Sequence, residues 1–388
     1  MKNQKNNNID QNLNKCVGDL RKNPMFNMSL SSKELFHSNF LAWLVENYPK
    51  EFDMVFSEIL DGNNIKIPSI LIEEGLGKVE RERRNKDLTI YLEDNKKIII
   101  ENKVKSLPDI KQLESYSEEN TYHILLSLYE PDWNMNSDNS FFIKNAKNQN
   151  HKWHYVSYNV LLGKLKDLNI NSKHKVYLED YVSFISLLSE LSLNIVNIKL
   201  DDEFEPLKYY ELFKEIRLHD LYQKIYFSKL NELLKKKNDE INFEDSKSFI
   251  FSTDLQSQSG RISIILNSEY RDNIDLEINV HNDKLILLLS DMNKSDFLKN
   301  TQSYELINEY FSILDKYSSD GIIYPTKPNE YCNTNQYFNI YRYRKTRINN
   351  KTIGEVLDIV IDGMNHIMKY KEDIFDEHRK YMKGLNKK

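Results

Sequence analysis

The sequence lacks the features that mark membrane, secreted and cysteine-rich proteins. No apolar run approaches the roughly 20 residues that a membrane-spanning helix needs, and the polar residues 1–8 are not expected to form a signal peptide. Only two cysteines occur, Cys16 and Cys332, and they lie far apart in the sequence. Their scarcity excludes a disulfide framework and a cysteine-rich zinc cluster, and it predicts a reducing, cytoplasmic location.

The chain also lacks an excess of positive charge. It carries 54 lysines and arginines against 59 aspartates and glutamates, a formal net charge of −5. A general basic coat is therefore excluded, and any nucleic acid would have to be bound by local basic patches. With 388 residues, 40% of them hydrophobic, the chain is expected to fold into two or three domains rather than to stay disordered.

The common short motifs of catalytic and ligand-binding sites are absent or incomplete. Residues 75–78 lack the spacing of a phosphate-binding loop and are expected to form a turn before a strand. His151 and His154 have no further histidine or cysteine close by, so no zinc site is predicted there. No serine occupies a nucleophile elbow, and neither cysteine has the sequence context of a nucleophile.

The order of the predicted elements indicates an α/β fold in the first half of the chain. Helices are predicted at about 33–47, 52–60 and 159–168, with another beginning at Pro108. Strands are predicted at 79–84, 87–92, 97–103, 122–128 and 153–157. A meander of strands followed by a helical crossover is expected to give a mixed sheet with helices on both faces.

The chain is predicted to divide into four parts. Residues 1–30, rich in Asn and Lys, are expected to be a flexible, loose or partly helical lead-in, and residues 31–200 to form the mixed-sheet domain. Residues 201–240 are expected to be a helical connector with one long helix over 207–234. Residues 241–388 are expected to form an α+β accessory domain, with strands at 262–266, 276–280, 285–289, 322–324 and 337–343 and helices at 293–317 and 353–370.

Asp87, Glu101 and Lys103 form the one constellation that predicts chemistry. Thirteen residues separate Asp87 from Glu101, a length that fits a strand, a tight turn and a returning strand. Glu101 and Lys103 are two apart, so both side chains point to the same face of a strand. In an antiparallel hairpin, Asp87 would lie level with Glu101. The three charged groups are then expected to converge at one end of the hairpin.

These groups have the chemistry of a metal site. Buried carboxylates are costly unless they are paired or bound to a metal ion, and two such donors with a backbone carbonyl suit Mg²⁺. A neighbouring lysine can orient or deprotonate an attacking water, or stabilise developing negative charge. The set therefore suits metal-assisted hydrolysis of a phosphodiester. The alternative interpretation is an ordinary salt bridge at the end of a hairpin.

The pattern Asp87, thirteen residues, Glu101-Asn102-Lys103 resembles the site of the PD-(D/E)XK nuclease superfamily, whose fold is restriction-endonuclease-like. The resemblance extends to residues 34–44, ELFHSNFLAWL, which are similar to the first helix of one bacterial branch. Arg81-Glu82 and residues 109–116 also fit that branch. One departure is Lys86, which precedes Asp87 where the family name has proline.

The resemblance implies roles for individual residues. Asp87, Glu101 and the main-chain carbonyl of Asn102 would bind Mg²⁺, for which Mn²⁺ could substitute, and Lys103 would act on the attacking water. Glu34 would be an additional acid at the metal, or else a charge that complements the start of its helix. Gln112 would point into the site, with Tyr116 on the same helix face packing above it or contacting nucleic acid. For His37, Ser38 and Asn39 the expectation is capping or packing.

Two basic regions are candidates for contact with nucleic acid. The first surrounds the proposed site and includes Arg81, Arg83, Arg84 and Lys105. The second interleaves tyrosines with cations over residues 341–347 and contributes Arg342, Arg344, Lys345 and Arg347. The alternative for the second region is a solvated strand whose tyrosines face the core.

Three functional hypotheses remain open at this point. The first is a Mg²⁺-dependent DNA endonuclease, which the family resemblance associates with defence against foreign DNA. The second is a non-cleaving module that binds nucleic acid or protein on a nuclease fold. The third is a nuclease subunit that relies on a partner protein for DNA recognition. A homodimer is a separate expectation, because cleavage of both strands by one active site often needs two copies.

Overall fold

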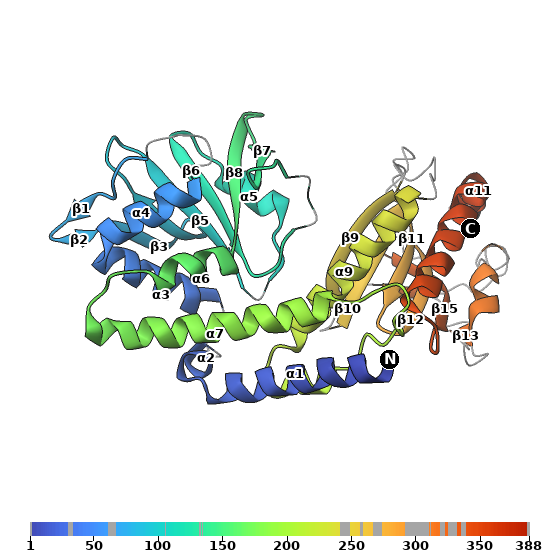
Figure 1. Cartoon of the computed structure of the whole chain (residues 1–388). Coiled ribbons are helices and arrows are strands. Elements are labelled where there is room, and N and C mark those ends of the chain that lie inside the picture. The colour runs from blue at the N-terminus through green and yellow to red at the C-terminus, as the bar shows by residue number, and fades with distance from the viewer. Residues whose placement is uncertain are drawn as a thin grey trace. The chain divides into compact units, whose positions relative to one another are not determined.

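The computed structural model describes residues 2–29, 34–60, 67–104, 106–131, 133, 135–240, 249–256, 259–266, 274–291, 310, 312–318, 323–324, 332–334 and 339–385. The chain divides into two compact units (Figure 1). The N-terminal unit comprises Met1–Ile195 and Leu212–Leu221, and the C-terminal unit comprises Val196–Glu211 and Tyr222–Lys388. In the part of the chain that the structure describes, no helix is long and apolar enough to cross a membrane.

A six-stranded mixed sheet forms the centre of the N-terminal unit (Figure 1). Its strands follow the order β3-β4-β5-β6-β8-β7. They are β3 (Val79–Arg83), β4 (Lys86–Tyr91), β5 (Lys97–Lys103), β6 (Thr121–Ser127), β8 (Asn150–Ser157) and β7 (Ser140–Lys144). The pairs from β3 to β5 and the pair of β7 with β8 are antiparallel, whereas β5, β6 and β8 run parallel. The mixed α/β fold predicted from the sequence is confirmed.

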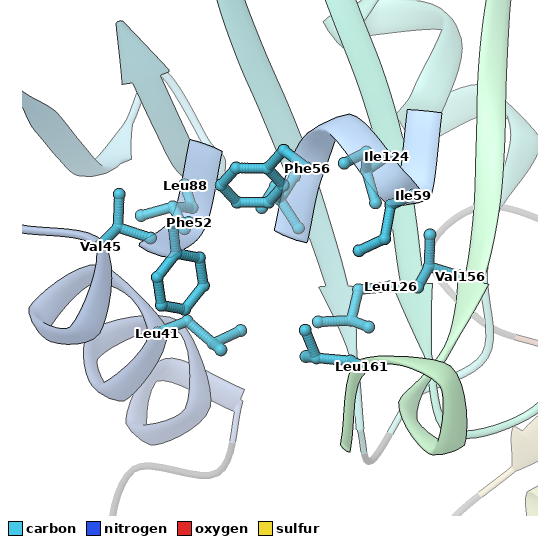
Figure 2. A pocket seen from close by; sticks show the side chains of 11 residues that line it. Leu41, Val45, Phe52, Phe56, Ile59, Leu88, Ile124, Leu126, Val156 and Leu161 are labelled. Carbon is cyan, nitrogen blue, oxygen red and sulfur yellow. The ribbon is translucent and has the colours of Figure 1, made fainter. Parts of the chain in front are cut away.

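Successive side chains of β5 point to opposite faces of the sheet and pack against different helices. On one face, Ile100 packs with residues of β4, β6 and β8 against α3 (Glu34–Asn47), α4 (Pro49–Leu60) and α6 (Tyr158–Lys166). Figure 2 shows the apolar side chains of these three helices and of the sheet pointing toward one another around a small cavity. The volume of this cavity is about 20 Å³. On the other face, Ile99 packs with Leu113 and Tyr116 of α5 (Ile110–Tyr116). Both faces of the central strand are therefore buried, as its apolar run Ile98–Ile100 requires.

Two helices stand where the sequence predicted a loose or partly helical lead-in. They are α1 (Lys2–Lys22) and α2 (Pro24–Ser29). Leu13, Cys16, Val17 and Leu20 are buried at the spacing of one helical face. The ring of Phe26 meets that of Phe184 on α7 (Ser172–Val196) at 5.5 Å between centroids. The apolar residues dispersed among the asparagines are thus sufficient to dock this segment.

The long helix predicted over 207–234 is interrupted. The structure has α8 (Tyr210–Glu215) and α9 (His219–Glu240) instead. Arg217 adopts the left-handed backbone conformation, with φ of 56°, and the N–H of Leu218 donates to the carbonyl of Phe213 at 2.9 Å. This is the geometry that ends a helix. The amphipathic spacing continues through the break, so it could not reveal the helix end.

The N-terminal unit also contains strands that the hydrophobic pattern did not predict. The edge strand β7 is one of them, and the small hairpin of β1 (Ile72–Glu73) with β2 (Leu76–Gly77) is another. Gly75 lies in the turn of this hairpin with φ of 83°, a conformation that favours glycine. The predicted turn before the first long strand is therefore present, as part of a hairpin.

The C-terminal unit is built on a seven-stranded sheet in which the strand pairs are antiparallel. Its strands are β9 (Phe249–Gln256), β10 (Ser259–Leu266), β11 (Ile274–His281), β12 (Lys284–Asp291), β13 (Ile323–Tyr324), β14 (Cys332–Thr334) and β15 (Asn339–Arg347). Among the described residues that follow the first strand of this sheet, the helices are the 3-10 helix η2 (Ser312–Tyr317) and α11 (Ile353–Leu385). A Cβ on Gly260 would clash with the ring of Phe227, so the close approach of β10 to α9 at this position requires a glycine. The predicted helix at 293–317 lies mostly outside the described residues, and its described end is η2.

We expect a large-to-small substitution in the core shown in Figure 2 to destabilise the N-terminal unit. Leu126 is buried beside an existing cavity, so Leu126→Ala should lower the free energy of unfolding by about 2–5 kcal/mol. All three tryptophans of the chain, Trp43, Trp133 and Trp153, belong to this unit. Urea titration followed by tryptophan fluorescence would therefore report on it. The exposed Val160→Ala is the matched control, and an equal loss in both variants would contradict this account of the core.

Candidate active site

The hairpin of β4 and β5 brings Asp87 and Glu101 to the same end of the sheet. Leu88 pairs with Ile100, and continuing this register by one residue places Asp87 opposite Glu101. Residues directly opposite in an antiparallel pair share a face. Both acids therefore lie on the side of the sheet where Ile99 packs against α5.

Glu101 and Lys103 form a buried ion pair on β5. The Lys103 Nζ lies 2.7 Å from the Glu101 Oε1, and the exposed fractions of the two side chains are 9% and 0%. Burying two charges costs free energy that a well-placed pair only partly recovers. Their position at the end of an isoleucine strand therefore indicates a use for the charges beyond holding the fold.

Asp87 is tied to β5 by a backbone hydrogen bond. The main-chain N–H of Asn102 donates to the Asp87 Oδ2 at 2.7 Å. This contact joins the two strands beyond the paired residues of the ladder, and it orients one carboxylate oxygen of Asp87 toward the Glu101–Lys103 segment. The spacing in the sequence predicted that the residues would converge, but it gave no sign of this bond.

The Asn102 side chain is turned to the opposite face of the sheet and is buried there. Its Nδ2 donates to the Ser38 Oγ of α3 at 3.2 Å, and its Oδ1 accepts from the Tyr158 hydroxyl of α6 at 2.5 Å. Sequence reasoning gave Ser38 only a capping or packing role and did not consider Tyr158. The position of Ser38 within the helix motif of residues 34–44 was the available signal.

Helix α5 brings two more predicted residues to the same side of the sheet. Asp109 caps its N-terminus by accepting from the N–H of Lys111. The Gln112 Nε2 donates to the Tyr116 hydroxyl at 3.0 Å. Burial raises the pKa of Tyr116, and the negative charges of Glu101 and Asp87 raise it further. Tyr116 packs with Ile99, so it lies on the same face of the sheet as the two acids.

Two of the cations near the site that were predicted to contact nucleic acid are paired with acids of the same chain. Arg81 forms an ion pair with Glu46, and Arg83 forms one with Glu80. Arg84 is exposed in the turn between β3 and β4. The positive charge of Arg81, Arg83 and Arg84 is therefore partly neutralised within the chain itself.

The remaining predicted site residues are Glu34, Lys105 and the cations of residues 342–347. Glu34 is the first residue of α3, but its side chain lies outside the described part of the structure, and so does Lys105. Arg342, Arg344 and Lys345 lie on β15, and only their backbone is described. Arg347, at the end of that strand, is exposed and lies 3.9 Å from Asp283.

The donor set at the end of β5 fits a hard divalent cation. It offers the carboxylate oxygens of Asp87 and Glu101 and the main-chain carbonyl of Asn102, all of which are oxygen ligands. Among the described residues, no three His, Cys, Asp or Glu side chains gather as a metal cage. Two carboxylates and a carbonyl leave room for water and a phosphate, which suits Mg²⁺ better than a closed protein cage.

Comparison with known proteins relates this part of the chain to a nuclease superfamily. Residues 25–183 match the family model of the PD-(D/E)XK nuclease superfamily, a span that contains Asp87, Glu101 and Lys103. No curated protein and no solved structure matches the chain. The resemblance inferred from the sequence is confirmed over residues 25–183, which are similar to this superfamily.

A buried histidine in the same sheet gives a test of this environment. Burial, together with a smaller effect of the nearby His151, lowers the pKa of His123 from 6.5 to about 3. Between these values the unfolded chain binds a proton that the folded chain excludes. The free energy of unfolding should therefore fall as the pH drops below 6.5.

We expect His123→Gln to reduce this acid sensitivity. The His123 Nε2 accepts from the N–H of Glu118 at 3.1 Å, and a glutamine could keep an acceptor there without titrating. Between pH 7 and pH 4.5 the unmodified protein should lose roughly 2–3 kcal/mol more stability than the variant. Urea titrations at the two pH values measure this difference. The same loss in both proteins would show that His123 is not held neutral.

Proposed function

We propose that the protein is a Mg²⁺-dependent endonuclease that hydrolyses phosphodiester bonds of DNA. The observation that carries the proposal is the convergence of Asp87, the buried Glu101–Lys103 pair and the Asn102 main chain at one end of the central hairpin. The match to a nuclease superfamily over the same residues supports it.

The residues of the site would divide the chemistry among them. Asp87, Glu101 and the carbonyl of Asn102 would hold the metal ion. When bound, the ion supplies positive charge that polarises a phosphate and lowers the pKa of a water. The Lys103 Nζ, fixed beside Glu101, can hold the attacking water or donate to phosphate oxygens as negative charge develops. Gln112, on the helix beside the acids, would orient the same water or phosphate.

A second candidate is a nuclease that engages DNA only with a partner protein or a second copy of the chain. The pairing of Arg81 with Glu46 and of Arg83 with Glu80 favours it, because these arginines have acidic partners within their own chain. Arg84 and the cations of β15 would then add only weak, salt-sensitive contacts. A role in defence against foreign DNA is part of the proposal on the family resemblance alone.

Cleavage assays test the proposed activity. Supercoiled, linear and single-stranded DNA should be compared with and without Mg²⁺, and we expect cleavage only with the metal ion. Asp87→Ala and Lys103→Ala should each lower the rate by at least about 100-fold, because each removes a group that acts on the reacting atoms. The exposed Glu93→Ala and Lys147→Ala are matched charge controls and should retain activity.

The outcomes of this assay separate the hypotheses. Mg²⁺-dependent cleavage that persists in folded Asp87→Ala and Lys103→Ala would refute the site. If the unmodified protein neither cleaves nor gives heat on titration with Mg²⁺ or Mn²⁺, the non-cleaving module is favoured. If it binds the metal ion but cleaves only when a partner is added, the partner-dependent nuclease is favoured.

The neutralised arginines lead to a separate expectation for DNA affinity. Glu46→Gln should release Arg81 for phosphate contact, tighten DNA binding several-fold and steepen its salt dependence by about one counterion. Glu58→Gln changes the net charge equally and releases Lys164, so it is the matched control. Binding isotherms at several salt concentrations measure both effects. Equal gains in the two variants would indicate a net-charge effect rather than a specific role of Arg81.

A further inference from the structure

Asn102 links the two faces of the central sheet. Its N–H donates to Asp87 on the side of the acids, while its carboxamide is held between Ser38 and Tyr158 on the helical side. The amide nitrogen donates to one hydroxyl and the amide oxygen accepts from the other. Both ends of the carboxamide are therefore satisfied, and its rotation is restrained from two directions.

The two hydroxyls belong to a larger buried network. Tyr158 also hydrogen-bonds Tyr181 of α7, and the Tyr181 hydroxyl lies 3.3 Å from the His37 Nδ1. His37, Ser38, Asn102, Tyr158 and Tyr181 are all buried. Buried polar groups are costly to leave unpaired, so such a network favours a single arrangement of its members. The network thereby connects the helices α3, α6 and α7 with the strand β5 around Asn102.

The paired residues of β4 and β5 do not extend as far as Asn102. The ladder between β4 and β5 extends to the pair of Leu88 with Ile100 and stops two residues before Asn102. On its other side, β5 stays paired with β6 through Lys103. The N–H and carbonyl of one strand residue point the same way, so the Asn102 carbonyl shares the Asp87 side with its N–H. The hydrogen bonds of the carboxamide with Ser38 and Tyr158 add a restraint on Asn102 from the helical side.

We propose that Ser38 and Tyr158 are positioning residues for the metal-binding edge of the site. By fixing the Asn102 carboxamide they hold its main-chain N–H against Asp87 and its carbonyl beside that carboxylate. Neither side chain lies on the acidic face, so they act through Asn102. This inference rests on the proposed function and adds to it the means by which the ligand geometry is set.

The test is the affinity of the full chain for Mn²⁺, measured by calorimetry without DNA. Tyr158→Phe and Ser38→Ala each remove one hydroxyl at little change in volume. We expect each variant to bind Mn²⁺ about 10–100-fold more weakly, the usual effect of losing a group that orients a ligand. The double variant should lose less than the product of the two factors, because both act on one carboxamide.

Two controls separate positioning from general stability. Ser117→Ala removes a buried hydroxyl of the same unit, one that accepts from the Trp153 Nε1, and Tyr222→Phe removes a buried phenol of the C-terminal unit. These variants should lose thermal stability comparably and keep the Mn²⁺ affinity. A loss of stability without a loss of affinity in Tyr158→Phe and Ser38→Ala would overturn the proposal.

Hydrogen exchange of the metal-free protein gives a second readout. The Asn102 amide lies on β5, and in Tyr158→Phe we expect it to exchange at least several-fold faster than in Ser117→Ala. Unchanged exchange would overturn the proposal. If the unmodified protein binds no Mn²⁺, the proposed function fails. If it binds Mn²⁺ with the same affinity as both variants, only the positioning role fails.

Discussion

The buried ion pair of Glu101 with Lys103 is the constraint on which the rest of the site depends. A strand that passes from Ile98, Ile99 and Ile100 directly into charged residues must either bury those charges or leave the sheet. The structure buries them, with Lys103 Nζ 2.7 Å from Glu101 Oε1. The desolvation cost of such a pair is a large fraction of the stability of a domain. The surrounding fold must therefore be rigid enough to keep the two groups together.

That rigidity comes from packing on both faces of the sheet, one of which carries the charged groups while the other contacts the helices. The odd-numbered positions of β5 carry Ile99, Glu101 and Lys103 toward the side of α5, while Ile98, Ile100 and Asn102 face the helices α3, α4 and α6. Asn102 is the exception among the inward residues, because its side chain is polar and its backbone binds Asp87. The helical layer and the acidic edge are thereby coupled through one residue, rather than through the ladder alone.

Electrostatics around the site are shaped by pairing within the chain rather than by net charge. The acidic balance of −5 includes Asp87 and Glu101, whose charge a metal ion would offset. At the same time Glu46 and Glu80 pair with the arginines of β3. The protein thus combines acidic groups suited to a cation with a basic patch whose charge is partly satisfied. The acidic groups bear on metal binding, and the paired arginines bear on how a nucleic acid would be held.

Short-range patterns in the amino-acid sequence were enough to predict the mixed sheet and the convergence of Asp87, Glu101 and Lys103. Those features depend on short-range rules, namely the two-residue period of a strand and the length of a hairpin. Local patterns also located α3, α4 and the strands β3 to β6. They did not locate the break between α8 and α9, because the apolar period continues through Arg217, whose backbone conformation ends the helix.

Contacts between side chains that are distant in the sequence could not be predicted from such patterns. Ser38 and Tyr158 reach Asn102 across 64 and 56 residues of chain, and Arg81 reaches Glu46 across 35. No periodicity encodes such contacts, since they arise from how helices dock on a sheet. The sequence pattern was therefore enough to predict which acids and which lysine belong to the candidate site. The contacts that orient Asp87 and Asn102, and the pairing that offsets the arginines, depend on packing in three dimensions.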